Sequence, residues 1–131
     1  MKKLSTILCV ALGLFMIYAG VSHFLKPVFY LPFVPEFLPF REAIVILSGL
    51  LEIFLGVAVL LPRYRHLGAL SIMALLVLFL PVHVADVIRD TPAIGSHGAA
   101  LVRLPIQVLF IFWAWVASRY APRTFPEPLH H

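Results

Sequence analysis

The sequence predicts an all-α integral membrane bundle of four transmembrane helices that form a single domain, residues 1–131. The chain has 131 residues, of which 62% are hydrophobic and only 12% are charged. Such a chain has too few polar side chains to cover a soluble domain of this size. The hydrophobic residues also gather in four runs, each long enough to cross roughly 30 Å of hydrocarbon as a helix at about 1.5 Å per residue. An open sheet cannot satisfy its backbone in lipid, so helices are expected.

The four runs place the helices at about residues 4–25, 42–61, 66–88 and 103–120. Lys2 and Lys3 before the first run are also typical of a signal peptide, but the run is long for one and lacks a clear small-x-small cleavage site, so we expect an uncleaved helix. Aromatic residues near the end of the fourth run are typical interfacial anchors. We expect residues 121–131 to be a disordered tail. Its last residues, His130 and His131, are either native or part of a truncated purification tag, and we assign no metal role to them.

The link between the first two predicted helices is rich in proline and aromatic residues. It reads KPVFYLPFVPEFLPF and carries four prolines within residues 26–40, a density that prevents a regular helix. Because the link is also apolar, it is expected to be ordered at the end of the bundle. Two alternatives stay open: an interfacial anchor, or a lid over the mouth of the bundle formed by Phe33, Phe37 and Phe40.

Lysine and arginine predict the orientation. With the N-terminus in the cytoplasm, six of these cations lie inside and four outside, which is a mild positive-inside bias. We therefore predict that both termini are cytoplasmic. The inside set is Lys2, Lys3, Arg63, Arg65, Arg119 and Arg123, and the outside set is Lys26, Arg41, Arg89 and Arg103.

Glu52 is the most unusual residue, because it interrupts the second run, ILSGLLEIFLGVAVLL. It follows Arg41 by eleven residues and so lies about 16 Å deep on a helix. A carboxylate at that depth costs ~2.5–3.5 kcal/mol on insertion scales. Gly49 and Gly56 beside it allow another helix to approach closely. We predict that Glu52 faces the interior, either in a structural pair with Arg103 or a histidine, or in a functional site.

The other polar residues of the runs fall in the same half of an up-and-down bundle, with Glu52 as the floor. Simpler roles are open for each: His23 bonded to backbone, Asp86 paired with Arg89, Arg103 extended to the head groups, and Gln107 joining two helices. Arg103 is expected to open the fourth helix, with Gln107 one turn further in. The predicted polar cluster is Glu52, Arg103, Gln107, His83, Asp86, His23 and Ser48.

Several function classes lack support in the sequence. The single cysteine, Cys9, excludes an internal disulfide, a CxxC redox pair and a cysteine-rich metal site. No His/Glu pair at helical spacing presents two ligands from one helix, so no metal site is predicted. Nucleophile motifs such as G-x-S-x-G are absent. The basic residues stand at the ends of the apolar runs, so no nucleic-acid partner is expected.

The order of these features resembles the DoxX-like family of small four-helix membrane proteins. The resemblance is carried by AGVSHFLKP, the Pro/Phe-rich link, SGLLEIFLGVAVLLPRYR, LFLPVHVADV and VRLPIQVLFIFWAW, which together span about residues 19–116. It implies a bundle in the bacterial inner membrane. Some relatives are linked to quinone-coupled sulfur oxidation or thiol redox complexes, and some eukaryotic relatives to receptor assembly. The chain has no cysteine pair for direct thiol chemistry.

Two functions follow as main hypotheses. The first is a redox-associated subunit that binds a quinone or another lipid-soluble small molecule in the polar cluster, and the second is a non-catalytic assembly factor or interaction subunit. Proton or small-solute transport is weaker, because no inverted repeat is evident. The partners expected are the lipid bilayer, a membrane redox or assembly protein, and a second copy in a homodimer. We do not expect an enzyme that acts alone.

Overall fold

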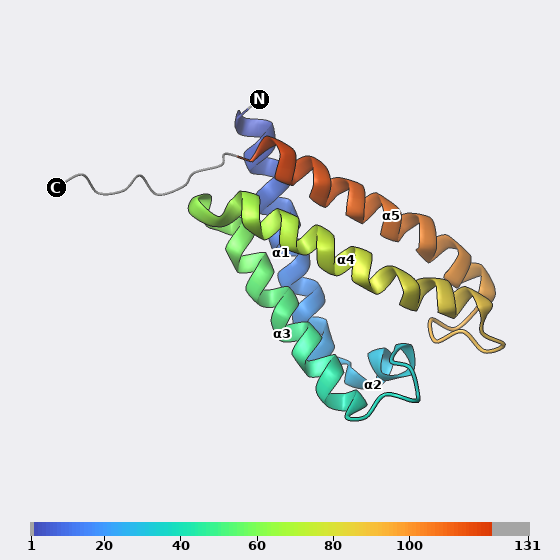
Figure 1. The fold of residues 1–131 in the computed structure, drawn as a ribbon. Helices are drawn as coiled ribbons and strands as arrows, with labels where there is room; N and C mark the ends of the chain where they lie inside the picture. Colours follow the sequence, from blue (N-terminus) through green and yellow to red (C-terminus); the bar gives the residue numbers. More distant parts are fainter. Residues whose placement is uncertain (1, 122–131) are drawn as a thin grey trace.

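The computed structural model describes residues 2–121, and this part of the chain is helical with no strand. Four long helices, α1 (Lys2–Leu25), α3 (Arg41–Leu60), α4 (Arg65–Ile88) and α5 (His97–Tyr120), make up most of it (Figure 1). A short helix α2 (Pro27–Tyr30) and two 3-10 helices, η1 (Leu31–Phe33) and η2 (Pro62–Tyr64), lie in the links. The all-α prediction is confirmed, with five α-helices rather than four. Four are long and apolar enough to cross a membrane.

The predicted helix bounds agree with α1, α3 and α4 to within two residues, but the start of α5 was wrong. Arg103 does not open this helix, because α5 begins at His97. Ser96 caps the new start: its hydroxyl accepts the backbone N–H of Ala99 at 3.1 Å, which satisfies one of the free donors of the first turn. Of the predicted tail, only Ala121 is described, and it packs into the core; the rest, with His130 and His131, lies outside the described residues.

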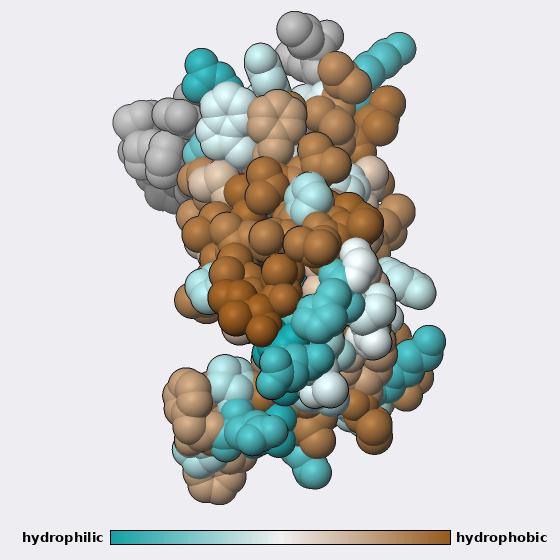
Figure 2. All heavy atoms as spheres, turned by 90° about the vertical axis from the view of Figure 1, so that its right-hand side faces the viewer, coloured by the Kyte–Doolittle hydropathy of each residue, from teal (hydrophilic) through white to brown (hydrophobic). Residues whose placement is uncertain are grey.

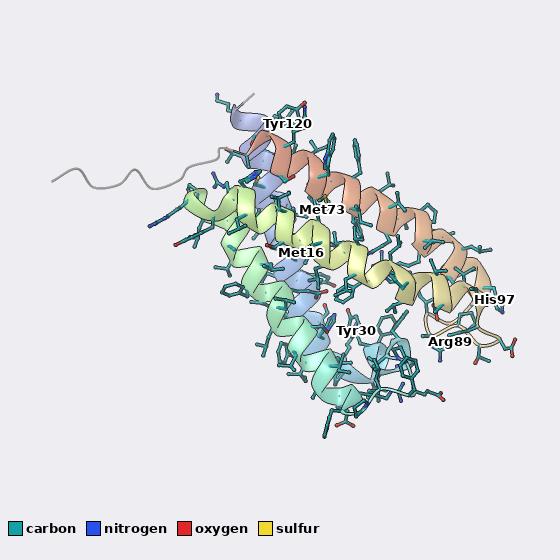
Figure 3. The ribbon with its side chains drawn as sticks, in the orientation of Figure 1. Met16, Tyr30, Met73, Arg89, His97 and Tyr120 are labelled. Atoms are coloured by element: carbon teal, nitrogen blue, oxygen red, sulfur yellow. The ribbon has the colours of Figure 1, made fainter. Side chains whose placement is uncertain are left out.

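The long helices form two antiparallel pairs, α1 with α3 and α4 with α5 (Figure 1). The pairs meet at the end where the described chain starts and stops, and they diverge toward the α1–α3 link. At the meeting end the Ser5 hydroxyl donates to the carbonyl of Tyr120 at 3.0 Å. The core lies in this half and includes Met16, with Met73 packed against it (Figure 3). The diverging half is therefore where an internal space can form.

Glycines bring α1 and α3 into close contact. A Cβ atom at Gly20 would lie 2.5 Å from the carbonyl oxygen of Gly49, and one at Gly13 would lie 2.7 Å from that of Gly56. No side chain fits at these distances, so glycine is required for the helices to approach this closely. The contact at Gly49 also includes the Cβ of His23. The close approach thus sets His23 against the face of α3 that carries Glu52.

The α1–α3 link is ordered and packs on the diverging end. Pro27 lies at the first position of α2, where its missing N–H costs nothing, so part of the link is helical although its prolines predicted no regular helix. Two arginines hold it: Arg41 donates to the carbonyls of Leu31 and Val34, both at 2.9 Å, and Arg89 donates to that of Pro32 at 2.6 Å. The link is therefore tied to both helix pairs.

The surface is divided by polarity along the molecule. Figure 2 faces the side of the α4–α5 link, on which Figure 3 labels Arg89 and His97. Hydrophobic side chains cover most of the upper half of this view, whereas a patch of hydrophilic side chains lies at its centre and below, with hydrophobic groups around it. On this face the hydrophilic patch therefore interrupts a mainly apolar surface.

Candidate functional site

A cavity of about 480 Å³ lies between the two helix pairs, next to the α1–α3 link. The link supplies one wall through Phe29, Tyr30, Phe33, Val34, Pro35 and Leu38. Most of the remaining wall is apolar as well, with residues of α3 and α4 such as Ile44 and Phe79. The side chains able to bind a polar head group are few: His23, Tyr30, Ser48, Glu52, His83 and Arg103. A mainly apolar space of this size with a few convergent polar groups is typical of a small-molecule site.

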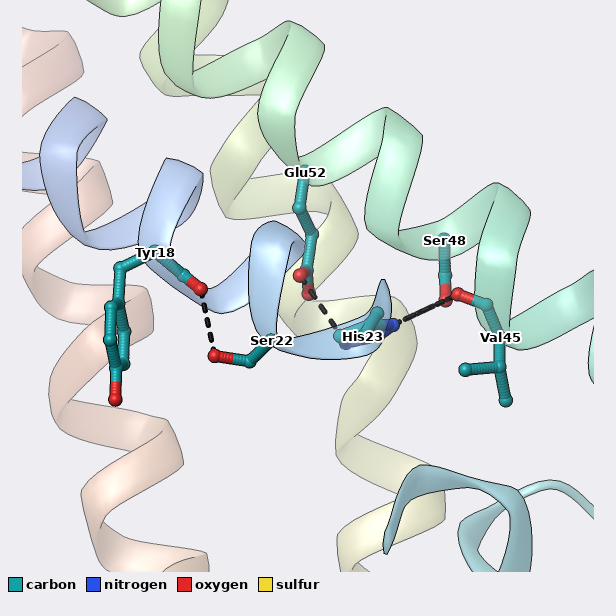
Figure 4. Close-up of polar contacts among 6 residues, drawn as sticks. All are labelled: Tyr18, Ser22, His23, Val45, Ser48 and Glu52. Atoms are coloured by element: carbon teal, nitrogen blue, oxygen red, sulfur yellow. Dashed lines mark hydrogen bonds and ion pairs between the residues drawn. The ribbon is translucent and has the colours of Figure 1, made fainter. Parts of the chain in front are cut away.

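His23 and Glu52 form the polar floor of the cavity (Figure 4). His23 Nε2 lies 3.3 Å from Glu52 Oε2, and both side chains are largely buried. The other ring nitrogen, Nδ1, lies 3.0 Å from the carbonyl oxygen of Val45. Because a carbonyl only accepts, Nδ1 must carry a proton. Ser48 supports this arrangement, since its hydroxyl donates to the same carbonyl at 2.9 Å and lies 3.2 Å from Nδ1.

Tyr30 covers His23 from the link. The two rings stack with centroids 4.0 Å apart (Figure 3 labels Tyr30). Burial raises the pKa of the Tyr30 phenol, so it is uncharged at neutral pH. The sequence did not single out Tyr30, because aromatic residues are common in an interfacial link and nothing local marks one as facing inward.

His83 and Arg103 come from the opposite helix pair. The Nδ1 atom of His83 is buried and has no hydrogen-bond partner among residues 2–121, and its ring meets Phe33 edge-on at 6.3 Å. The Arg103 guanidinium lies over the ring of Phe110 at 5.5 Å and makes no hydrogen bond or ion pair within the described part of the chain. Both side chains line the cavity with polar groups that are available to a ligand.

Asp86 and Gln107 do not line the cavity, so the predicted cluster is divided. Asp86, 3% exposed, accepts the backbone N–H groups of Ala93 and Ile94 and so closes the α4–α5 link rather than pairing with Arg89. Gln107, 1% exposed, donates to the carbonyl of Leu76 at 2.9 Å and joins α5 to α4. These two residues have structural partners in the described chain.

Of the three phenylalanines of the possible lid, only Phe33 lines the cavity. Phe37 and Phe40 are 84% and 82% exposed and are not on the cavity wall. In this structure the lid alternative is therefore supported by Phe33 alone. Leu38 and Phe29 of the link also lie on the cavity wall.

The polar groups do not make a metal site as placed: within residues 2–121, no group of three or more His, Cys, Asp or Glu side chains gathers at metal-binding range. The chemistry available is hydrogen bonding, one permanent cation at Arg103, and proton exchange at the His23–Glu52 pair.

The comparisons with known proteins identify a family without an assigned activity. No curated protein matches the chain, and no solved structure matches it. One family model covers residues 12–118, a region that contains α3, α4 and every residue on the cavity wall. The chain belongs to the family described as a domain of unknown function, DUF8561.

Proposed function

We propose that the chain is a multi-pass protein of the bacterial inner membrane, with α1, α3, α4 and α5 crossing the bilayer and both termini in the cytoplasm. Each long helix carries large apolar side chains that face outward with more than half of their surface exposed, among them Leu14, Leu47, Leu67 and Leu109. Lipid would cover this surface, since exposing it to water costs about 25 cal/mol per Å². The cation bias supports the orientation.

In this proposal, the cavity binds a lipid-soluble small molecule of the quinone class. One observation carries it: an apolar space holds two polar side chains without hydrogen-bond partners, Arg103 and His83, opposite a His–Glu pair. A quinone has an apolar body and two carbonyl oxygens that accept hydrogen bonds, which suits this division. A buried polar group without a partner costs about 1–3 kcal/mol; His83 Nδ1 is such a group, and a bound head group would relieve that cost.

The protein is then a redox-associated subunit rather than an enzyme that acts alone, with a membrane redox protein as its partner. The likeness to the DoxX-like family, which includes quinone-linked members, agrees with this proposal. The alternative is a non-catalytic assembly factor. The structural hydrogen bonds of Asp86 and Gln107 favour it, because they show that some intramembrane polar residues here hold the helices and links together.

Native mass spectrometry of protein released in a mild detergent tests the proposal. We expect the wild type to retain a small lipid-soluble molecule at one copy per chain, and the Arg103→Gln variant to lose most of it. Arg119→Gln is the matched control, because Arg119 stacks on Trp115 at the opposite end of α5 and should not affect retention. An empty wild-type protein that also fails to bind added quinone would contradict the proposal and favour the assembly factor.

A further inference from the structure

The acidic and basic side chains on the cavity wall are not paired with each other. Among residues 2–121, Glu52 is the only acidic residue that lines the cavity, and Arg103 is a permanent cation on the same wall. A direct ion pair between them would make the cavity neutral. Glu52 instead meets His23, and no carboxylate lies within ion-pair distance of Arg103 among residues 2–121.

The facing atoms of the His23–Glu52 pair lie within ion-pair distance, although Glu52 Oε2 makes no hydrogen bond among residues 2–121. His23 Nδ1 is already committed to the carbonyl of Val45, so the facing Nε2 and Oε2 atoms, 3.3 Å apart, need one proton to attract each other. With no proton, two lone pairs would face each other. With one proton the pair is neutral overall, whether it is a neutral acid with a neutral imidazole or a carboxylate with an imidazolium. A pair that holds this proton carries no net charge to offset Arg103, and Glu52 does not contact the Arg103 guanidinium.

The other polar groups on the wall add no negative charge. Tyr30 keeps its proton, because burial raises the pKa of its phenol. Ser48 is neutral, and His83 contributes either no charge or a positive one. Apart from the Glu52 carboxyl group, the polar groups of α1, α2, α3, α4 and α5 that line the cavity within residues 2–121 are thus neutral or cationic.

We propose that the cavity selects a lipid-soluble acid: an apolar molecule whose single ionised oxygen group pairs with the Arg103 guanidinium. This inference rests on the proposed ligand site and narrows its ligand class from neutral quinones to acidic molecules, such as an ionised hydroxyquinone or a fatty carboxylate. The apolar body lies against the link wall of Phe29, Phe33 and Leu38. A neutral ligand would leave a cation half-buried without a counter-charge, which is costly.

Two matched ligand pairs test the proposal on the full chain in lipid nanodiscs, with empty nanodiscs subtracted. One pair is a hydroxynaphthoquinone, ionised at neutral pH, and its uncharged methyl ether; the other is dodecanoate and dodecanol. We expect the wild type to bind the acid of at least one pair about tenfold more tightly or better, the size of a charge-assisted hydrogen bond. Arg103→Gln should lose this preference, while Arg103→Lys should keep part of it and Arg119→Gln all of it.

The outcomes separate the two proposals. Equal binding of acid and neutral partner by the wild type, or a preference that survives in a folded Arg103→Gln variant, would overturn this inference and leave the ligand site standing. A preference for dodecanoate with no binding of either naphthoquinone would support it and exclude the quinone class. Absence of binding by all four molecules would overturn both proposals. Thermal unfolding of each variant establishes that it is folded, and Arg103→Lys supplies the comparison if Arg103→Gln is not.

Discussion

At the scale of single residues, Glu52 tests whether the polar floor is structural. Glu52→Leu leaves His23 Nε2 facing an apolar side chain, so we expect a loss of about 1–3 kcal/mol in the free energy of unfolding. Glu52→Gln keeps the shape and a donor for Nε2, and should cost less than about 1 kcal/mol. Glu42→Gln, at an exposed position of α3, is the control. Denaturant unfolding in detergent measures all three. A Glu52→Leu protein as stable as the wild type would show that the His23–Glu52 pair does not contribute to the free energy of unfolding.

The polar residues within the apolar runs predicted most of the candidate site, but they did not show which of them lie on the cavity wall. His23, Ser48, Glu52, His83 and Arg103 all line the cavity. Asp86 and Gln107 looked equivalent to these residues in the sequence, but they do not line the cavity. The rotation of a helix about its axis decides which way a side chain points, and no neighbouring residue in the sequence indicates that rotation. Tyr30 was missed for the same reason, since its inward position depends on how the link folds back.

At the scale of helices, the α1–α3 contact should be intolerant of any side chain. Gly20→Ala would place a Cβ 2.5 Å from the Gly49 carbonyl oxygen, and overpacking of this kind costs about 1–3 kcal/mol. The displaced α1 would also move His23 from Glu52, so ligand binding should fall with stability. Gly98→Ala is the matched control, because nothing lies within 4 Å of a Cβ there and alanine is the better helix former. Thermal unfolding compares the two, and equal melting temperatures would contradict the packing argument.

The α1–α3 link should be held in place by the two arginines that donate to its carbonyls, Arg41 and Arg89. Arg41→Met removes the donors to Leu31 and Val34, so we expect faster hydrogen exchange in residues 31–38 and weaker ligand binding, because these residues form a cavity wall. Arg63→Met, in η2 at the other end of the bundle, should leave exchange in the link unchanged. Unchanged exchange in Arg41→Met would mean that packing alone orders the link.

Long elements were predictable and short ones were not. The apolar runs placed three long helices closely, because hydrophobic length is a property of the sequence itself. The first turn of α5 lies before the apolar run, so in the sequence only the Ser96 cap indicated where this helix begins. The short helix α2 depends on Pro27 standing at its first position, a case in which proline begins a helix instead of preventing one.

At the scale of the whole molecule, the fold places the cavity and its link at one end and both ends of the described chain at the other (Figure 1). This arrangement follows from an even number of long helices joined in up-and-down order. The proposed orientation in the membrane therefore also places the cavity: with the termini in the cytoplasm, the cavity lies in the outer half of the bilayer.

Single cysteines can establish that orientation. In a Cys9→Ser background, we expect Lys3→Cys and Arg63→Cys to be protected from a membrane-impermeant maleimide in intact cells, and Glu36→Cys and Asp90→Cys to react. All four positions are exposed, so protection reports the side of the membrane and not burial. Permeabilised cells are the control, in which all four should react. Labelling of Lys3→Cys and Arg63→Cys in intact cells, with Glu36→Cys and Asp90→Cys protected, would reverse the orientation and place the cavity toward the cytoplasm. A ligand would then have to reach Arg103 from the inner leaflet, so this result decides from which side of the membrane the site is supplied.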